Sequence, residues 1–328
     1  INKAFDLKES AELTIRSGRL LVDSGMDVFS NAVVRVEGGH LGTSLTLNTN
    51  AVVDVTGGTL QTYGTFTVRS NALVRLAGGL LHVTAAPSGL TAERFSFSGG
   101  TLRWANTSTI NQNMFHLLPP AGGVLEHRSS SYEAFYVGAA GAASFDGTIV
   151  ATNRATGTPG FRFYKKNYTL SGKGTLLVDQ LYIDGGYKVT LTNKKLLLGT
   201  GLISRGSGGA IYSFPEGMTF GAWGDWRTRR TDYDYVSNAP TVQLGGDVAF
   251  ETCDCRDGRT RRTISLSRCT DIGLRSLSVS GGGTVDLAFA GGLDGLDRIV
   301  VGADTTLVLT NTATTIAVRR LKMERGAR

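Results

Sequence analysis

The sequence predicts an all-β chain built as a β-solenoid of stacked coils, and two observations support this prediction. First, an alternating strand that ends in a glycine pair recurs near the start, at residues 34–41, 53–60, 74–81 and 95–102. Its second glycines, Gly39, Gly58, Gly79 and Gly100, follow one another at a nearly constant interval. Second, Val, Thr, Leu and Gly dominate, and good helix formers do not recur at helical spacing. A fixed period of roughly twenty residues is typical of stacked repeats, because one unit cannot bury its apolar face alone.

Each unit predicts a strand followed by a tight turn. Apolar and polar residues alternate within the unit, which is the period of a strand with one buried face. The glycine pair then supplies a positive φ or a bulge that a residue with Cβ would resist. Asn31, Asn50 and Asn71 precede three of the strands. Either their amides bond from coil to coil as a ladder, or each Asn favours its own turn.

The order of these patterns along the chain predicts one domain over residues 1–328, with about fifteen coils. The regular repeats occupy residues 1 to about 104, and Ser17-Gly18-Arg19-Leu20 extends the series one step upstream. From 105 to 142 the pattern loosens, which predicts a loop insertion into the stack. Aromatic and charged residues concentrate at 221–262, which predicts a contact region. The opening motif returns at Ser280-Gly281-Gly282-Gly283.

The charge of +7 is local rather than spread along the chain. Arginines gather in three places, at Arg227, Arg229 and Arg230, at Arg256, Arg259, Arg261 and Arg262, and at Arg319, Arg320, Arg325 and Arg328. Such patches suit an acidic polysaccharide, an anionic surface or nucleic acid, or they form a solvated face. We expect no nucleic-acid partner, because no nucleic-acid fold signature accompanies the charge.

Two further features concern the location of the chain. No run of about eighteen apolar residues predicts a transmembrane helix. The chain begins at Ile1 without a signal sequence, so we expect a mature or excised piece.

The sequence predicts neither a metal nor a cofactor. Cys253, Cys255 and Cys269 are an odd number of thiols without a neighbouring His, so a strained bridge, a thiol pair and buried thiols all stay open. The segment Gly199-Thr200-Gly201 lacks the third glycine of a dinucleotide loop. Residues 291–297 match one unit of a calcium-binding glycine and aspartate repeat, and one copy predicts only a turn. The histidines His40, His82, His116 and His127 are scattered, and His40 occupies a repeat position that other residue types share.

The repeat units resemble those of autotransporter-type passenger domains and related bacterial surface proteins. The similar residues are the Val-x-Val-x-Gly-Gly-x-Leu units, the Asn-Ala-Val-Val openings and the closing Val-Ser-Gly-Gly-Gly-Thr-Val-Asp-Leu, and they cover about two-thirds of the chain. The resemblance implies a right-handed parallel β-helix, a secreted or cell-surface location, and a role in adhesion or scaffolding.

Two functions remain open at this point. The first is a non-enzymatic surface module that is structural, adhesive or filament-forming, with a glycan, a matrix component, a protein or a second copy of the chain as partner. Its candidate ligand-binding residues are Trp223, Trp226, Arg229, Arg230, Tyr233 and Tyr235. The alternative is a polysaccharide lyase or glycoside hydrolase that uses Asp232, Asp234 or Asp257 as catalytic acids. We prefer the first, because no strong catalytic signature is present.

Overall fold

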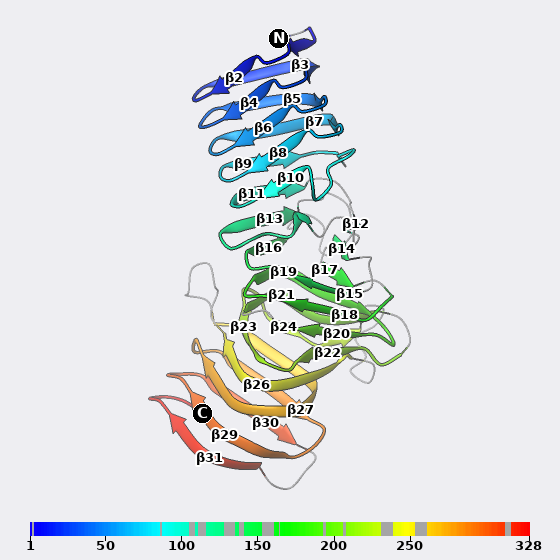
Figure 1. Cartoon of the computed structure of the whole chain (residues 1–328). Helices are drawn as coiled ribbons and strands as arrows, with labels where there is room; N and C mark the ends of the chain where they lie inside the picture. Colours follow the sequence, from blue (N-terminus) through cyan, green and yellow to red (C-terminus); the bar gives the residue numbers. More distant parts are fainter. Residues whose placement is uncertain are drawn as a thin grey trace. The chain divides into compact units, whose positions relative to one another are not determined.

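The computed structural model describes residues 1, 3–85, 87–104, 109–110, 116–127, 135–137, 141–152, 161–163, 165–192, 195–205, 208–230, 239–252, 261–311 and 316–328. Strands dominate these residues, and no α-helix occurs among them. Parallel coils stack into a β-solenoid of about 12 turns. The predicted all-β solenoid fold is therefore confirmed (Figure 1).

The chain divides into two compact units. Unit 1 comprises Ile1–Phe135 with Phe145–Gly157, and unit 2 comprises Tyr136–Ser144 with Thr158–Arg328. Much of the predicted insertion at 105–142 lies outside the described residues. The single domain with its insertion therefore stays a prediction.

Unit 1 contains two parallel sheets, whose strands are coloured blue to green in Figure 1. The first holds β2 (Glu12–Ile15), β4 (Val33–Val36), β6 (Val52–Val55), β8 (Leu73–Leu76) and β10 (Phe95–Phe97). The second holds β1 (Phe5–Leu7), β3 (Arg19–Val28), β5 (His40–Leu47), β7 (Thr59–Val68), β9 (Leu80–Val83), β11 (Gly100–Trp104), β13 (Gly123–His127) and β16 (Thr148–Ala151). A short strand, β12, covers Thr109–Ile110.

The apolar positions of the repeat stack directly upon one another in unit 1. Leu41 pairs with Leu60, Leu60 with Leu81 and Leu81 with Leu102, and all four side chains are fully buried. The same in-register pairing joins the buried Val34, Val53 and Val74 of the other sheet. Burying each such side chain contributes about 1.5–3 kcal/mol, so these columns form the core of unit 1.

The turns of unit 1 use glycine and asparagine in the left-handed region. Gly58 and Gly79 have φ of +56° and +64°, and a Cβ on Gly58 would lie 2.3 Å from the Gly39 carbonyl oxygen. Glycine is therefore required both by conformation and by the close approach of the preceding coil. Asn31, Asn50 and Asn71 have φ of 61°, 63° and 57° and are exposed. Their conformation supports the interpretation that each Asn stabilises its own turn.

Unit 2 contains some coils that are longer than the repeats of unit 1 and others of about the same length. Its strands are β15 (Gly141–Ser144), β17 (Phe161–Phe163), β18 (Tyr168–Ser171), β19 (Thr175–Asp184), β20 (Lys188–Leu191), β21 (Lys195–Arg205), β22 (Ile211–Phe214), β23 (Gly217–Ala222), β24 (Trp226–Arg227), β25 (Arg229–Arg230), β26 (Thr241–Glu251), β27 (Thr263–Ser280), β28 (Thr284–Phe289), β29 (Leu293–Val301), β30 (Thr306–Asn311) and β31 (Ile316–Met323). β14 (Phe135–Val137) contains the boundary between the units. Met218 pairs with Val248, and Val248 pairs with Leu277, so these coils are about half as long again as the repeats of unit 1. The solenoid has about 12 turns rather than the fifteen expected.

Aromatic side chains fill the core of unit 2. Phe220 stacks on Phe250 with ring centroids 4.9 Å apart, and Phe214 meets Phe220 edge to face. The buried Tyr212 hydroxyl lies 2.6 Å from the Leu181 carbonyl oxygen and 2.9 Å from that of Ile203.

No helix that is long and apolar enough to cross a membrane occurs in the described part of the chain.

Candidate functional site

Trp223 is the one predicted ligand-binding residue whose side chain the structure describes. It follows β23, and its backbone N–H donates to the Leu198 carbonyl. A Cβ built on Gly199 would lie 2.7 Å from the indole and 2.8 Å from a carboxylate oxygen of Asp179. Gly199 thus leaves the space in which the half-buried indole and the Asp179 carboxylate flank the backbone.

The structure places Trp226, Arg229 and Arg230 by their backbones. In β24, Trp226 pairs with Ile264, and in β25 Arg229 and Arg230 pair with Ile203 and Ser204. These three residues therefore belong to the coil that stacks between β21 and β27. The strand segment at 226–230 follows Trp223 directly, so four of the six predicted residues share one coil.

The remaining chemical predictions for this region lie mostly outside the described residues. Tyr233 and Tyr235 lie there, as do Asp232, Asp234 and Asp257 of the enzymatic alternative and the thiols of Cys253 and Cys255. Cys269 is described, and it is buried and free. Burial, followed by the charge of Asp286, raises the pKa of this thiol, which therefore stays protonated and unreactive.

An ion pair also crosses β23, the strand that precedes Trp223. Lys195 Nζ lies 2.7 Å from Glu251 Oε2, and both side chains are about one-third exposed. Lys195 pairs with Thr219 and Gly221 pairs with Glu251, so the ion pair crosses the intervening strand β23. The region that contains Trp223 thus combines an aromatic ring, the carboxylates of Asp179 and Glu251, and a lysine.

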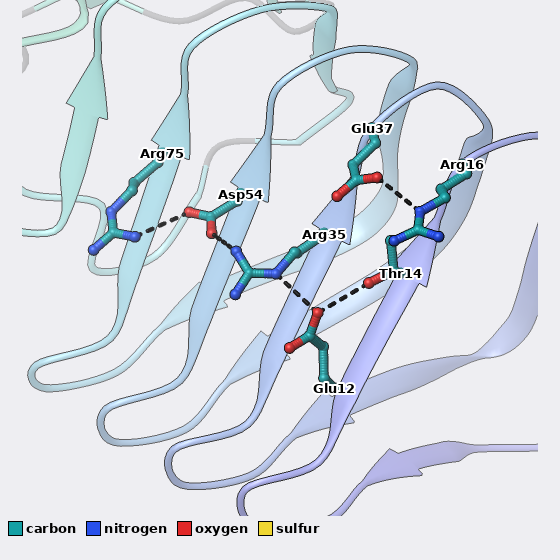
Figure 2. Close-up of polar contacts among 7 residues, drawn as sticks. All are labelled: Glu12, Thr14, Arg16, Arg35, Glu37, Asp54 and Arg75. Carbon is teal, nitrogen blue, oxygen red and sulfur yellow. Dashed lines mark hydrogen bonds and ion pairs between the residues drawn. The ribbon is translucent and has the colours of Figure 1, made fainter.

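A row of alternating charges runs across the first sheet of unit 1, and the sequence analysis missed it. Figure 2 shows this charge column, which consists of Glu12, Arg35, Asp54 and Arg75. Arg35 Nε lies 2.9 Å from Glu12 Oε1, and Arg35 Nη1 lies 2.9 Å from Asp54 Oδ2. Arg75 Nη1 reaches the other Asp54 oxygen at 3.3 Å. Arg35, Asp54 and Arg75 are consecutive partners in the strand register, so each charge meets its opposite on the next coil.

Within the charge column, the contact between Arg35 and Glu12 shifts the pKa of both groups. The hydrogen bond from Arg35 lowers the pKa of the Glu12 carboxyl, and a second hydrogen bond from Thr14 adds to this effect. The same bond, which Arg35 donates to Glu12, raises the pKa of Arg35. Both groups are therefore held in their charged forms.

Unit 2 contains a buried ion pair that the sequence analysis also missed. Arg162 Nη2 lies 2.5 Å from Asp184 Oδ1, and both side chains are at most 10% exposed. The backbone N–H of Lys165 donates to the other Asp184 oxygen. The alternation Gln180-Leu181-Tyr182-Ile183-Asp184 was the available signal, because it places polar groups at every second position of a strand.

No group of three or more His, Cys, Asp or Glu side chains in the described part of the chain is placed to hold a metal ion. Comparisons with known proteins add no further identification. No protein family, no curated protein and no solved structure matches this chain.

Proposed function

We propose that this chain is a non-enzymatic β-solenoid of the cell surface or the extracellular space, with a structural, adhesive or filament-forming role. The observation that carries the proposal is the charge column of unit 1. Its ionic groups contact the next coil and so maintain the stack. The autotransporter-like repeat motifs support a secreted or surface-exposed location.

The adhesive part of the proposal concerns residues 221–262. Trp223 is half-buried beside Asp179, and the arginines at 227, 229 and 230 follow within the same coil. An aromatic face with nearby charged groups suits a glycan, a matrix component or a protein partner. We assign this contact surface to Trp223, Trp226, Arg229, Arg230, Tyr233 and Tyr235.

The filament-forming part concerns β31. Leu321 and Met323 are 62% and 49% exposed, although they pair in register with the buried Ile299 and Val301. Strand pairing by a second copy would cover these side chains, which supports self-association.

Substitution of four residues tests the adhesive part. We expect Trp223→Ala, Trp226→Ala, Arg229→Ala and Arg230→Ala together to weaken binding to a glycan array or to cell surfaces at least about tenfold, a loss of about 1.4 kcal/mol. The far-UV circular dichroism spectrum should not change, because the core columns remain intact.

The matched control removes two exposed arginines elsewhere, with Arg319→Ala and Arg325→Ala. Equal loss in both variants would mean that net charge alone governs binding. Unchanged binding by a folded fourfold variant would contradict the contact surface. New reducing ends or unsaturated products from acidic polysaccharides would instead establish the enzymatic alternative.

A further inference from the structure

Two neighbouring coils of unit 2 separate at one corner. The register that joins β27 to β28 ends at Cys269 and Phe289, and pairing with β29 resumes at Ser276 and Arg298. The segment between these pairs is therefore longer in one coil, at 290–297, than in the other, at 270–275. The separation leaves a pocket of about 390 Å³, lined by Asp271, Gly273, Leu274, Arg275, Gly292 and Gly295.

A bulge in β27 shapes one wall of this pocket. On the preceding strand, Leu244 pairs with Asp271, but Gly246 pairs with Leu274, so β27 contains an extra residue. Gly273 has a φ of +105°, which only glycine adopts easily. Asp271 Oδ1 accepts the backbone N–H groups of Gly273 at 2.8 Å and Leu274 at 2.7 Å. These two bonds fix the carboxylate, and the described hydrogen bonds leave its Oδ2 atom without a donor.

Arg275 contributes the opposite charge to the same pocket. Its Nη2 atom lies 2.8 Å from Asp247 Oδ2, and the side chain is 69% exposed. Since a guanidinium has five N–H donors, this contact leaves others for a ligand. The pocket therefore presents one oriented acceptor at Asp271 and several donors at Arg275.

Gly295 lies at the register shift between Leu293 and Leu296 of β29, but neither its φ nor a close contact requires glycine there. Its φ lies outside the left-handed region, and a Cβ built on it would meet nothing within 4 Å. Gly58, by contrast, has a positive φ and its added Cβ would collide with the preceding coil. Because Gly295 has no side chain, the pocket stays open at this wall.

The paired charges indicate the class of ligand. A cation attracted by Asp271 would be opposed by Arg275, an anion attracted by Arg275 would be opposed by Asp271 and Asp247, and calcium needs six to eight oxygen ligands. A neutral ligand with adjacent hydroxyl groups satisfies both side chains, because each hydroxyl donates and accepts. The volume lies at the lower end of the range for small-molecule pockets, which fits one or two sugar rings. We propose that this pocket binds a neutral saccharide unit.

This site goes beyond the function proposed above, since none of its residues belongs to the 221–262 contact surface. The probes are the neutral disaccharides cellobiose, maltose, lactose and N,N′-diacetylchitobiose, each titrated into the full chain and followed by saturation-transfer NMR. We expect saturable binding of at least one disaccharide. Glucuronate and glucosamine should bind no more tightly than glucose, the neutral monosaccharide of the same size, because a charge that one of the two side chains attracts is opposed by the other. Tighter binding of either charged sugar than of glucose would contradict the neutral class of ligand. Absence of saturable binding for all four disaccharides would overturn the proposal.

Filling the pocket provides the decisive comparison. Gly295→Leu should weaken disaccharide binding at least tenfold, whereas Gly209→Leu should have no effect. Gly209 is the matched control because it is exposed in unit 2, outside the pocket, and its added Cβ would also meet nothing within 4 Å. Equal binding by Gly295→Leu and the unsubstituted chain would overturn the assignment of the site.

A second variant tests the site independently, in case Gly295→Leu does not fold. Asp271→Asn keeps an oxygen for the two backbone N–H groups but removes the charged acceptor, so it should also weaken binding several-fold. Binding that is unaffected by Asp271→Asn would contradict the role of this carboxylate. The fourfold variant at Trp223, Trp226, Arg229 and Arg230 should still bind the disaccharides, so the failure of one proposal is distinguishable from the failure of the other.

Discussion

Arg35 shows how a single residue ties three coils of unit 1 together. Its Nε atom contacts Glu12 of one coil and its Nη1 atom contacts Asp54 of another (Figure 2). Lysine, with one compact ammonium group, would not present two such donors in a fixed planar geometry. The guanidinium therefore suits a position between two carboxylates on neighbouring strands.

The pKa of Glu12 leads to a prediction on pH dependence. Because this pKa is lowered in the folded chain, the interaction stabilises the fold above the ordinary value of 4.5 and is lost as the pH falls through the lowered value. We expect Glu12→Gln to lower the urea midpoint near neutral pH, and the difference should vanish in acid. Added salt should also shrink it, because the pair is exposed.

Glu9→Gln is the control, since Glu9 is an exposed glutamate outside the charge column. Its urea midpoint should match that of the unsubstituted chain throughout the pH series. A Glu12→Gln deficit that grows on acidification would contradict the predicted sign.

At the scale of the residue, the sequence contained a signal for the charge column but none for the surroundings of Trp223. The charges at 12, 35, 54 and 75 alternate in sign and are spaced near the repeat period, so the signal for the charge column was present. In the strand register, however, Thr14 and not Glu12 pairs with Arg35. Glu12 lies two residues earlier, so matching of equivalent repeat positions does not find it. The role of Gly199 in seating Trp223 could not be predicted, because it depends on which coils are adjacent.

At the scale of the element, the glycines at the corner of unit 1 allow neighbouring coils to approach one another closely. Gly79 has a φ of +64°, and a Cβ on it would lie 2.3 Å from the Gly57 carbonyl oxygen. Gly18 starts the same series with a φ of +72°, but its added Cβ would meet nothing within 4 Å. A side chain at position 18 would therefore cost only the strain of the left-handed conformation, whereas a side chain at position 79 would also collide with the backbone of the preceding coil.

Substitution of these two glycines tests this difference. Gly18→Ala should destabilise unit 1 by about 1–2 kcal/mol, the cost of a left-handed conformation for a residue with Cβ. Gly79→Ala should cost more, because the collision with Gly57 adds to it. Urea unfolding measures both variants, and equal destabilisation would show that the close approach of the backbones contributes nothing.

The length of the coils explains which elements the sequence could predict. The nearly constant period of the glycine-paired units predicted the strands of unit 1, such as β6 and β8. In unit 2, β27 contains extra residues that shift its register against β26, so its pattern has no fixed period. The pocket at Asp271 forms where such a bulge meets a coil of different length, and its position therefore depends on tertiary pairing.

At the scale of the whole molecule, stability in a stack of coils comes mainly from contacts between neighbours. The chain correspondingly contains two compact units, each with its own core columns. A local change in one unit should therefore leave the stability of the other unaltered.

Hydrogen exchange measured by mass spectrometry tests this locality. Asp54 is 7% exposed between two arginines, so Asp54→Asn should destabilise its surroundings by about 1–3 kcal/mol. We expect faster amide exchange in β4, β6 and β8 and unchanged exchange in β27 and β29. Glu37→Gln, which removes an exposed partner of Arg16, should have a smaller effect. Equal acceleration throughout the chain would mean that both units unfold together.

The charge column has a further consequence during folding. The apolar faces of β4, β6 and β8 are nearly interchangeable, so a chain that is still folding could pair β4 with β8 and skip a coil. In that arrangement Arg35 would lie against Arg75, and the repulsion between like charges would oppose it. The alternation of sign thus favours pairing of each strand with the strand of the adjacent coil while the stack is being assembled.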